Sequence, residues 1–171
     1  MIFYFSATGN SKYVAERVAG ATDDHLIFLR DAIRSRCYHF DVSLEKGIGF
    51  VVHAYCCGLP SILHFFVDKL RLSGYEDQYV YLVLTCGSAT GDAAGQLGKL
   101  LGKKGIALNA QFAVPMVDNN VTAHKIPDRE EIDRRLDGAE EYIDEACRAI
   151  RARGAGDCNR CQGALPGALT A

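Results

Sequence analysis

Apolar runs alternate with amphipathic stretches along most of this chain. The runs are rich in β-branched and aromatic residues, and the longest ones have almost no polar interruption, which is typical of strands buried on both faces of a sheet. Five runs are expected to be strands: 2–5, 26–29, 48–54, 79–84 and 108–115. The segment 31–46 follows neither the strand nor the helix period, and it predicts no element.

Four stretches between and after these runs have the period of a helix with one apolar face. The first covers residues 11–19, and the second begins at Pro60, a residue favoured at helix starts. The third covers residues 92–104, where Gly105 is a plausible stop. The fourth begins at Asp128, and its many mixed charges indicate a solvated outer face.

Alternation of strands and helices predicts an α/β fold with a doubly wound parallel sheet covered by helices on both faces. In such sheets ligands bind beyond the carboxyl ends of the strands, where the strand order reverses. Three loops of unusual composition follow predicted strands: SATGNS at 6–11, YCCG at 55–58 and TCGSATG at 85–91. Their agreement indicates a binding site at this edge.

Composition narrows the function classes. The 171 residues suit one domain, 49% of them are apolar, and the formal net charge is −2. There is no basic footprint for nucleic acid, and no apolar run approaches the ~20 residues of a membrane span. We therefore expect a cytoplasmic protein without nucleic-acid or membrane partners. Its seven cysteines, irregularly spaced, are expected to be free thiols rather than a disulfide framework.

The first loop, 6–11, is rich in side chains that donate hydrogen bonds. A helix N-terminus presents unpaired N–H groups and a partial positive charge, so hydroxyl and amide groups added to it make a cup for a phosphate dianion. The loop contains no Lys or Arg, and it matches neither G-x-x-x-x-G-K-[ST] nor G-x-G-x-x-G. The alternative is an ordinary helix cap provided by Asn10 or Ser11.

The sequence FYFSATGNSKYVAE, residues 3–16, resembles the phosphate-loop signature of flavodoxins, [ST]-x-T-G-[NT]-[ST] after the first strand. It is most similar to the flavodoxin domain of flavodoxin–ferredoxin fusion proteins of anaerobes. HAYCCGLP at 53–60 and TCGSATG at 85–91 match the second and third loops of those proteins in order and spacing. The resemblance covers roughly residues 1–150 and implies the flavodoxin-like strand order 2-1-3-4-5.

The resemblance also implies an FMN site at the three loops. By similarity, the first loop would wrap the FMN phosphate, and the second and third would border the isoalloxazine ring. The residues implied are Ser6, Ala7, Thr8, Gly9, Asn10 and Ser11 for the phosphate, Tyr55, Cys56, Cys57 and Gly58 for one side of the ring, and Thr85, Cys86, Gly87, Ser88 and Gly91 for the other side and the pyrimidine edge.

The similarity to the fusion proteins suggests domain boundaries. We expect an FMN-binding domain at 1–153 and a loose Gly- and Ala-rich tail at 154–171. Within the tail, Cys158 and Cys161 have the spacing of half an iron–sulfur or zinc site. Compared with the fusion proteins, the given sequence ends about where a ferredoxin domain would begin, so we expect a vestige or a truncation, without a cluster; a zinc shared by two chains is the alternative.

Several residues near these loops have two interpretations. Gly58 either permits a peptide flip that presents a carbonyl to flavin N5, as in flavodoxins, or simply lets the strand turn into the helix at Pro60. The adjacent Cys56 and Cys57 are either a redox dithiol or, more simply, small residues lining a pocket. His53 is expected to be a satisfied core histidine, and His124 to lie in a surface loop.

One departure from classical flavodoxins bears on function. The chain has no Trp, and its third loop has no aromatic residue, so only Tyr55 is available to stack on a flavin. The leading hypothesis is an FMN-binding electron carrier that serves redox protein partners, either ferredoxin-like proteins or a reductase. An FMN-dependent NAD(P)H oxidoreductase acting on quinones or similar small acceptors is the second hypothesis. A module that binds a phosphorylated ligand without redox chemistry is the third.

Overall fold

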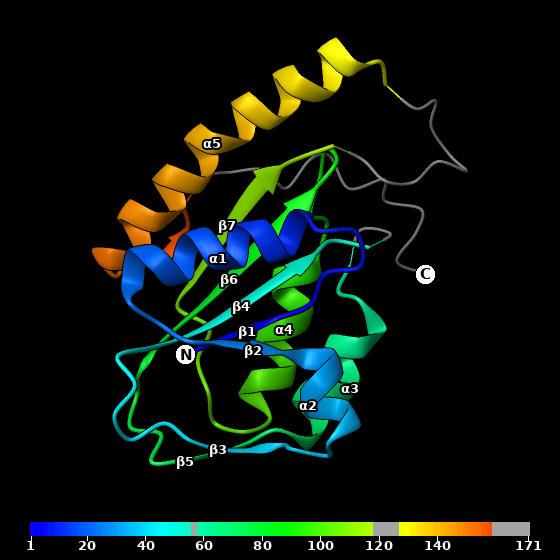
Figure 1. Cartoon of the computed structure of the whole chain (residues 1–171). Coiled ribbons are helices and arrows are strands. Elements are labelled where there is room, and N and C mark those ends of the chain that lie inside the picture. Colours follow the sequence, from blue (N-terminus) through cyan, green and yellow to red (C-terminus); the bar gives the residue numbers. More distant parts are fainter. Residues whose placement is uncertain (56–57, 118–126, 159–171) are drawn as a thin grey trace.

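The computed structural model describes residues 1–55, 58–117 and 127–158. Figure 1 shows three layers, with a parallel sheet between two layers of helices. The strands of this sheet are β1 (Ile2–Tyr4), β2 (Leu26–Phe28), β4 (Gly47–His53), β6 (Tyr79–Cys86), β7 (Ala110–Pro115) and β8 (Gly156–Asp157). The helices are α1 (Asn10–Thr22), α2 (Leu29–Arg34), α3 (Ser61–Lys69), α4 (Ala93–Gly102) and α5 (Arg129–Arg151).

The strand order is β2-β1-β4-β6-β7-β8, and every neighbouring pair is parallel. The five predicted strands are β1, β2, β4, β6 and β7, so the predicted flavodoxin-like order 2-1-3-4-5 is confirmed. The order reverses between β1 and β4, because the chain moves outward from β1 to β2 and then returns past β1 to β4. This reversal places the crevice of a doubly wound sheet at the carboxyl ends of these two strands.

Each face of the sheet has its own core. One core lies beneath α3 and α4, and the other lies beneath α1 and α5 (Figure 1). Successive side chains of a strand alternate between the two faces, so Val51 and Val83 enter the second core while Val52 and Leu84 enter the first. Every residue of β6 is buried, as expected for a central parallel strand.

The segment 31–46, for which the sequence predicted no element, contains most of α2 and the strand β3 (His39–Asp41). β3 pairs in parallel with β5 (Arg71–Ser73) to form a separate two-stranded sheet. Both strands have only three residues and only their central side chains are partly buried, so neither has the apolar run that identifies a strand.

The predicted loose tail begins with an ordered strand. Gly156 and Asp157 of β8 pair with Ala110 and Gln111 of β7 and so add a sixth strand to the sheet. The expectation of a loose chain was therefore wrong for these first residues, which pair through backbone groups that no side-chain pattern reveals. Cys161 and the rest of the tail lie outside the described residues. Within the described ranges, no helix is long and apolar enough to cross a membrane.

Candidate functional site

The three predicted loops follow β1, β4 and β6, which are adjacent in the sheet, so the loops meet at one edge (Figure 1). Backbone hydrogen bonds extend the sheet into this edge. The Phe5 N–H donates to the Val51 carbonyl at 3.0 Å, and the Ala54 N–H donates to the Thr85 carbonyl at 2.8 Å. The structure therefore brings the start of all three loops together, as the sequence predicted from their order alone.

The first loop leads into α1 through a glycine with an unusual backbone. Helix α1 begins at Asn10, and Gly9 occupies the N-cap position with φ 112° and ψ −33°. No side chain caps the helix, so the alternative of an ordinary cap by Asn10 or Ser11 is wrong. The first amide groups of α1 have no carbonyl partner inside the helix, and they face outward from its start.

Side chains of the first loop hold the loop in shape. The Ser6 hydroxyl accepts the Gly9 N–H at 3.0 Å, and the Asn10 side-chain amide donates to the Val117 carbonyl at 3.1 Å, which ties the loop to the end of β7. Ala7 and Thr8, between them, are exposed. These hydrogen bonds fix the shape of the loop, and its tip faces solvent.

The start of α1 fits a phosphate group in both space and charge. A Cβ placed on Gly9 would meet no atom of the described residues within 4 Å, so these residues leave the space over this backbone open. The first turn of α1 carries no acidic residue that would repel an anion. Glu16 lies one turn further along the helix, where its Oε1 is 3.7 Å from the Lys12 Nζ and the two charges pair. Open amides at a helix start, an adjacent exposed Thr8 hydroxyl and a glycine backbone make a donor set suited to a dianion.

Two glycines of this region should respond oppositely to substitution by alanine. Gly9→Ala should lower the free energy of unfolding by about 1–3 kcal/mol, because φ 112° is strained for any residue with a Cβ even where space is available. Gly20→Ala, inside α1 and equally unobstructed, should raise it by about 0.5–1 kcal/mol. Urea unfolding of both variants measures the difference, and equal effects would contradict the assigned backbone of Gly9.

The side chains of Ser11 and Thr85 meet beneath the loops, and the cofactor contacts that the resemblance implies for these two residues stay a prediction. Their side chains are only 1% and 2% exposed, and their hydroxyl oxygens lie 2.8 Å apart. The pair joins the first turn of α1 to the end of β6 beneath the loops. In the structure each hydroxyl is therefore engaged with the other, below the exposed surface, and neither presents an open group there.

A double-mutant cycle tests this hydroxyl pair. Ser11→Ala and Thr85→Val should each cost about 1–3 kcal/mol of unfolding free energy, because each leaves the other hydroxyl buried without its partner. The double variant should cost clearly less than the sum of the two single variants, since replacing both partners by apolar groups removes the unsatisfied group. Additive costs in urea unfolding would mean that the two hydroxyls do not depend on each other.

The second loop closes on itself through its first and last residues. The Tyr55 N–H donates to the Gly58 carbonyl at 2.8 Å, and the Gly58 N–H donates to the Tyr55 carbonyl at 2.9 Å. The Tyr55 side chain is 64% exposed, at the mouth of the candidate site. Cys56 and Cys57, on which the dithiol and pocket-lining interpretations rest, lie outside the described residues.

Gly58 lies directly against the side chain of Gln96. A Cβ on Gly58 would lie 2.9 Å from both the oxygen and the nitrogen of the Gln96 amide, which reaches over from α4. The same Gln96 oxygen accepts the Leu59 N–H at 2.9 Å and so fastens the second loop to α4. The peptide flip at Gly58 remains a prediction. It would break the hydrogen bond that the Gly58 N–H donates to the Tyr55 carbonyl, so the flip would cost that hydrogen bond.

The third loop divides into a buried start and an exposed turn. Cys86 is buried, and its carbonyl accepts the Met116 N–H at 2.8 Å, whereas Gly87 and Ser88 are exposed. Gly91 has φ 57°, a left-handed conformation that favours glycine at this turn before α4. Of the residues predicted here, Gly87 and Ser88 are therefore the most exposed, and Gly91 is partly exposed.

His53 is a residue of this edge that sequence reasoning misplaced. It was expected in the core, but it is the last residue of β4 and only partly buried. Its imidazole lies 5.7 Å from the Phe5 ring and 6.0 Å from the Tyr55 ring, measured between ring centres. Burial lowers the pKa of His53 from its ordinary value of 6.5. The position of His53 in the sequence, just before the YCCG loop, was the signal that could have placed it at this edge.

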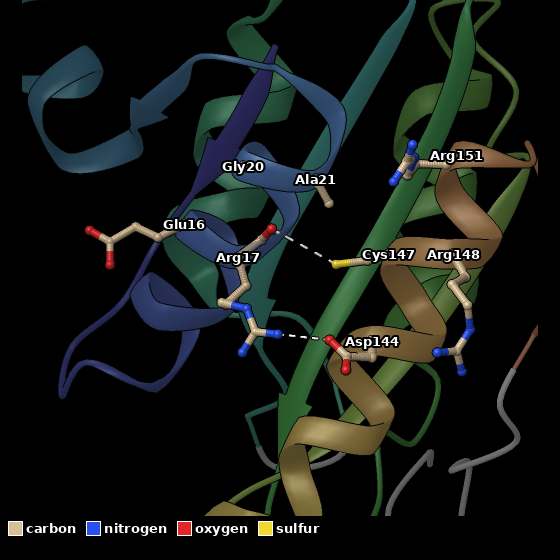
Figure 2. Close-up of a pocket in the computed structure, with 8 residues that line it drawn as sticks. All are labelled: Glu16, Arg17, Gly20, Ala21, Asp144, Cys147, Arg148 and Arg151. Carbon is tan, nitrogen blue, oxygen red and sulfur yellow. Dashed lines mark hydrogen bonds and ion pairs between the residues drawn. The ribbon is translucent and has the colours of Figure 1, made fainter.

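Two grooves are found among the described residues. One of about 440 Å³ separates α1 from α5, where the Arg17 guanidinium pairs with Asp144 at 2.7 Å (Figure 2) and also with Glu140. These two ion pairs link α1 to α5, and the hydrogen bonds that the guanidinium donates to Glu140 and Tyr13 raise the pKa of Arg17. The other, about 460 Å³, lies between α4 and the strands β7 and β8.

His124 lies outside the described residues, within which no cluster of three His, Cys, Asp or Glu is placed to hold a metal.

Comparison with known proteins shows similarity in structure. No protein family and no curated protein matches the sequence of this chain. The Trp repressor binding protein of Bacillus subtilis superposes with a TM-score of 0.55 at 18% identity, covering 88% of this chain and 97% of that protein. An azoreductase of Bacillus anthracis gives 0.52 at 13% identity, covering 90% of this chain and 98% of the azoreductase. The Megasphaera elsdenii flavodoxin gives 0.51 at 16% identity, covering 84% of this chain and 99% of the flavodoxin.

These similarities cover nearly the whole of each compared protein, and they include a flavodoxin and an azoreductase at comparable scores. At 18% identity or less they establish the fold and not the activity. The specific similarity to flavodoxin–ferredoxin fusion proteins stays a prediction. The chain has the flavodoxin-like fold, an architecture that a flavodoxin and an azoreductase share with it.

Proposed function

We propose that this protein binds FMN at the carboxyl edge of its sheet and passes electrons between redox protein partners. The observation that supports this most directly is the start of α1. Its amides are uncapped, the space above Gly9 is open, and Thr8 is exposed beside them. Such a helix start is suited to an anionic group such as a phosphate monoester.

The loops offer complementary surfaces for the rest of the cofactor. Residues of the first loop and the amides of α1 would hold the phosphate, Tyr55 would lie against the ring system, and Gly87 and Ser88 would border its polar edge. Bound there, FMN supplies electron-transfer chemistry that side chains alone do not provide. The protein's contribution would be to orient the cofactor, to cover part of its ring and to leave an edge open to a partner.

Flavin titration tests the proposal. We expect the purified protein to bind one FMN per chain, with quenching of flavin fluorescence, and to bind FAD more weakly, because the site offers one phosphate cup and no second glycine-rich loop. FAD binding as tight as FMN binding would contradict the single-phosphate site. A protein that remains colourless and ignores FMN would favour the third hypothesis, a module for another phosphorylated ligand.

A second candidate function is an FMN-dependent NAD(P)H oxidoreductase acting on quinones or similar small acceptors. Tyr55 favours the oxidoreductase. It is the aromatic residue available in the described second and third loops, and it is exposed, so one face of the flavin ring would stay accessible to a small acceptor. Structural similarity to an azoreductase is compatible with this chemistry. Steady oxidation of NAD(P)H in the presence of a quinone would support the oxidoreductase. Absence of that activity, with reduction by a partner protein, would support the electron carrier.

A further inference from the structure

A row of aromatic rings runs along the carboxyl edge of the sheet. Phe28 ends β2, and its ring centre lies 6.4 Å from that of Phe5, which follows β1. The Phe5 ring lies 5.7 Å from the imidazole of His53 at an interplanar angle of 41°. His53 lies 6.0 Å from Tyr55 at 77°, an edge-to-face contact. The row therefore joins three neighbouring strands to the one exposed ring at the candidate site.

His53 is the one member of this row whose charge changes near neutral pH. Burial alone lowers its pKa, and no charged side chain contributes to the shift. Its neighbours from the packed elements are the uncharged ring of Phe5 on β1, the phenol of Tyr55, and Thr85, its partner in register on β6. The nearest charged group along the row is Arg30, which lies over the Phe28 ring at 4.8 Å. The imidazole is thus neutral at pH 7 and packs as a ring.

We propose that His53 is a positioning residue for flavin binding: it holds the Tyr55 ring edge-on at the mouth of the site, and uptake of a proton by its imidazole, which a bound flavin would cover further, weakens the binding of flavin. This inference rests on the proposed FMN site. It concerns a residue that the flavodoxin resemblance did not single out. It also predicts that the affinity for riboflavin, which has no phosphate to titrate, depends on pH.

The direction of the pH effect follows from burial. A flat ring placed against Tyr55 covers His53 further, which disfavours the imidazolium and lowers its pKa below that of the flavin-free protein. The complex then holds fewer protons than the free protein between the two pKa values. By linkage, flavin affinity falls as the pH drops through that interval, by up to about tenfold per pH unit for one proton.

The first experiment needs no flavin. Proton NMR titration gives the His53 pKa in the flavin-free protein, with the resonance assigned by its absence in His53→Gln. Tyr55→Leu should raise this pKa toward 6.5, because the covering ring is gone, while Tyr55→Phe, which keeps a ring, should leave it as in the wild type. An unchanged His53 pKa in Tyr55→Leu would overturn the pairing of the two side chains.

The second experiment measures riboflavin affinity from pH 5 to 8. Riboflavin is the probe because the FMN phosphate itself titrates near pH 6. Wild-type affinity should fall below pH 6.5, and His53→Phe, which retains a ring without a titrating proton, should bind with a flat pH profile. His53→Gln should bind more weakly than His53→Phe at pH 8. A wild-type profile as flat as that of His53→Phe would overturn the proposal.

The two experiments separate the failure of this inference from that of the proposed function. If the wild type binds neither FMN nor riboflavin at any pH, the flavin site itself is wrong and the inference falls with it. If FMN binds but the riboflavin profile is flat, the flavin site stands and the role of His53 is refuted. If flavin binding follows the predicted profile and the NMR titration shows the Tyr55 dependence, both stand.

Discussion

Replacing Thr8 by Val and Asn10 by Ala together should weaken FMN binding by about two to four orders of magnitude. A hydrogen bond to a charged group contributes about 1.5–3 kcal/mol, so the loss of two such donors amounts to about 3–6 kcal/mol. Each 1.4 kcal/mol is tenfold in affinity. Fluorescence titration of FMN against the wild type and the double variant measures the effect.

Riboflavin is the matched control for this double variant. It carries the same ring system without the phosphate, so its affinity should change little. Equal losses for FMN and riboflavin would refute the assignment of the first loop to the phosphate.

The structure adds a second control, because the Asn10 amide also donates to the Val117 carbonyl. The single variant Asn10→Ala removes that tie and should lower stability by about 1 kcal/mol. Urea unfolding of each single variant, measured beside its FMN affinity, therefore separates a damaged loop from a lost contact with phosphate. A loss of FMN-binding free energy that clearly exceeds the loss of unfolding free energy in the same variant is the clearest expected result.

The main sheet was predictable because its strands carry a strong local signal. Residues 48–54 and 79–84 are long apolar runs, and parallel strands joined by right-handed crossovers allow few arrangements. The flavodoxin resemblance then supplied the order, which β1, β4 and β6 follow. The strands β3, β5 and β8 were not predictable. They have two or three residues without an apolar run, and they form through backbone pairing with partners far away in sequence.

Gly9 was predictable at the candidate site, because a glycine between a strand and a helix start has a local reason in the backbone. The contacts of Ser11, His53 and Gly58 were not predictable from local pattern. Ser11 meets Thr85 across 74 positions of sequence, and Gln96 reaches Gly58 from another helix. His53 looked like a core residue because β4 is apolar, but the strand ends at that residue and its side chain reaches the site.

Gly49 shows the same limit inside the core, and its replacement should have the largest effect on stability. Gly49 interrupts the apolar run of β4, and the sequence gives no reason for it. In the structure it lies opposite Tyr81 of β6, and a Cβ on Gly49 would lie 2.6 Å from both Cζ and the hydroxyl oxygen of Tyr81. The Tyr81 ring is 1% exposed and stacks on Tyr79 at 5.6 Å, so it has little room to move.

Gly49→Ala should therefore lower the free energy of unfolding by about 3 kcal/mol, the upper end of the usual cost of overfilling a core. Urea unfolding measures this cost. Gly98→Ala in α4 is the matched control, since a Cβ there meets nothing within 4 Å and alanine in a helix should raise stability by about 0.5–1 kcal/mol. A change of similar size and sign in the two variants would contradict the contact between Gly49 and Tyr81.

Variants of Tyr81 test whether its ring is the reason for the glycine at position 49. Its hydroxyl is buried near Thr22 but, by distance and angle, makes no hydrogen bond within the described residues, and burial raises the pKa of Tyr81. Tyr81→Phe should accordingly be neutral or slightly stabilising, because it removes an unsatisfied group and keeps the ring. Tyr81→Leu removes the atoms that a Cβ on Gly49 would strike, so Gly49→Ala should cost far less in that background than in the wild type. An undiminished cost in the Tyr81→Leu background would show that the glycine is required by the backbone of β4 and not by the ring that covers it.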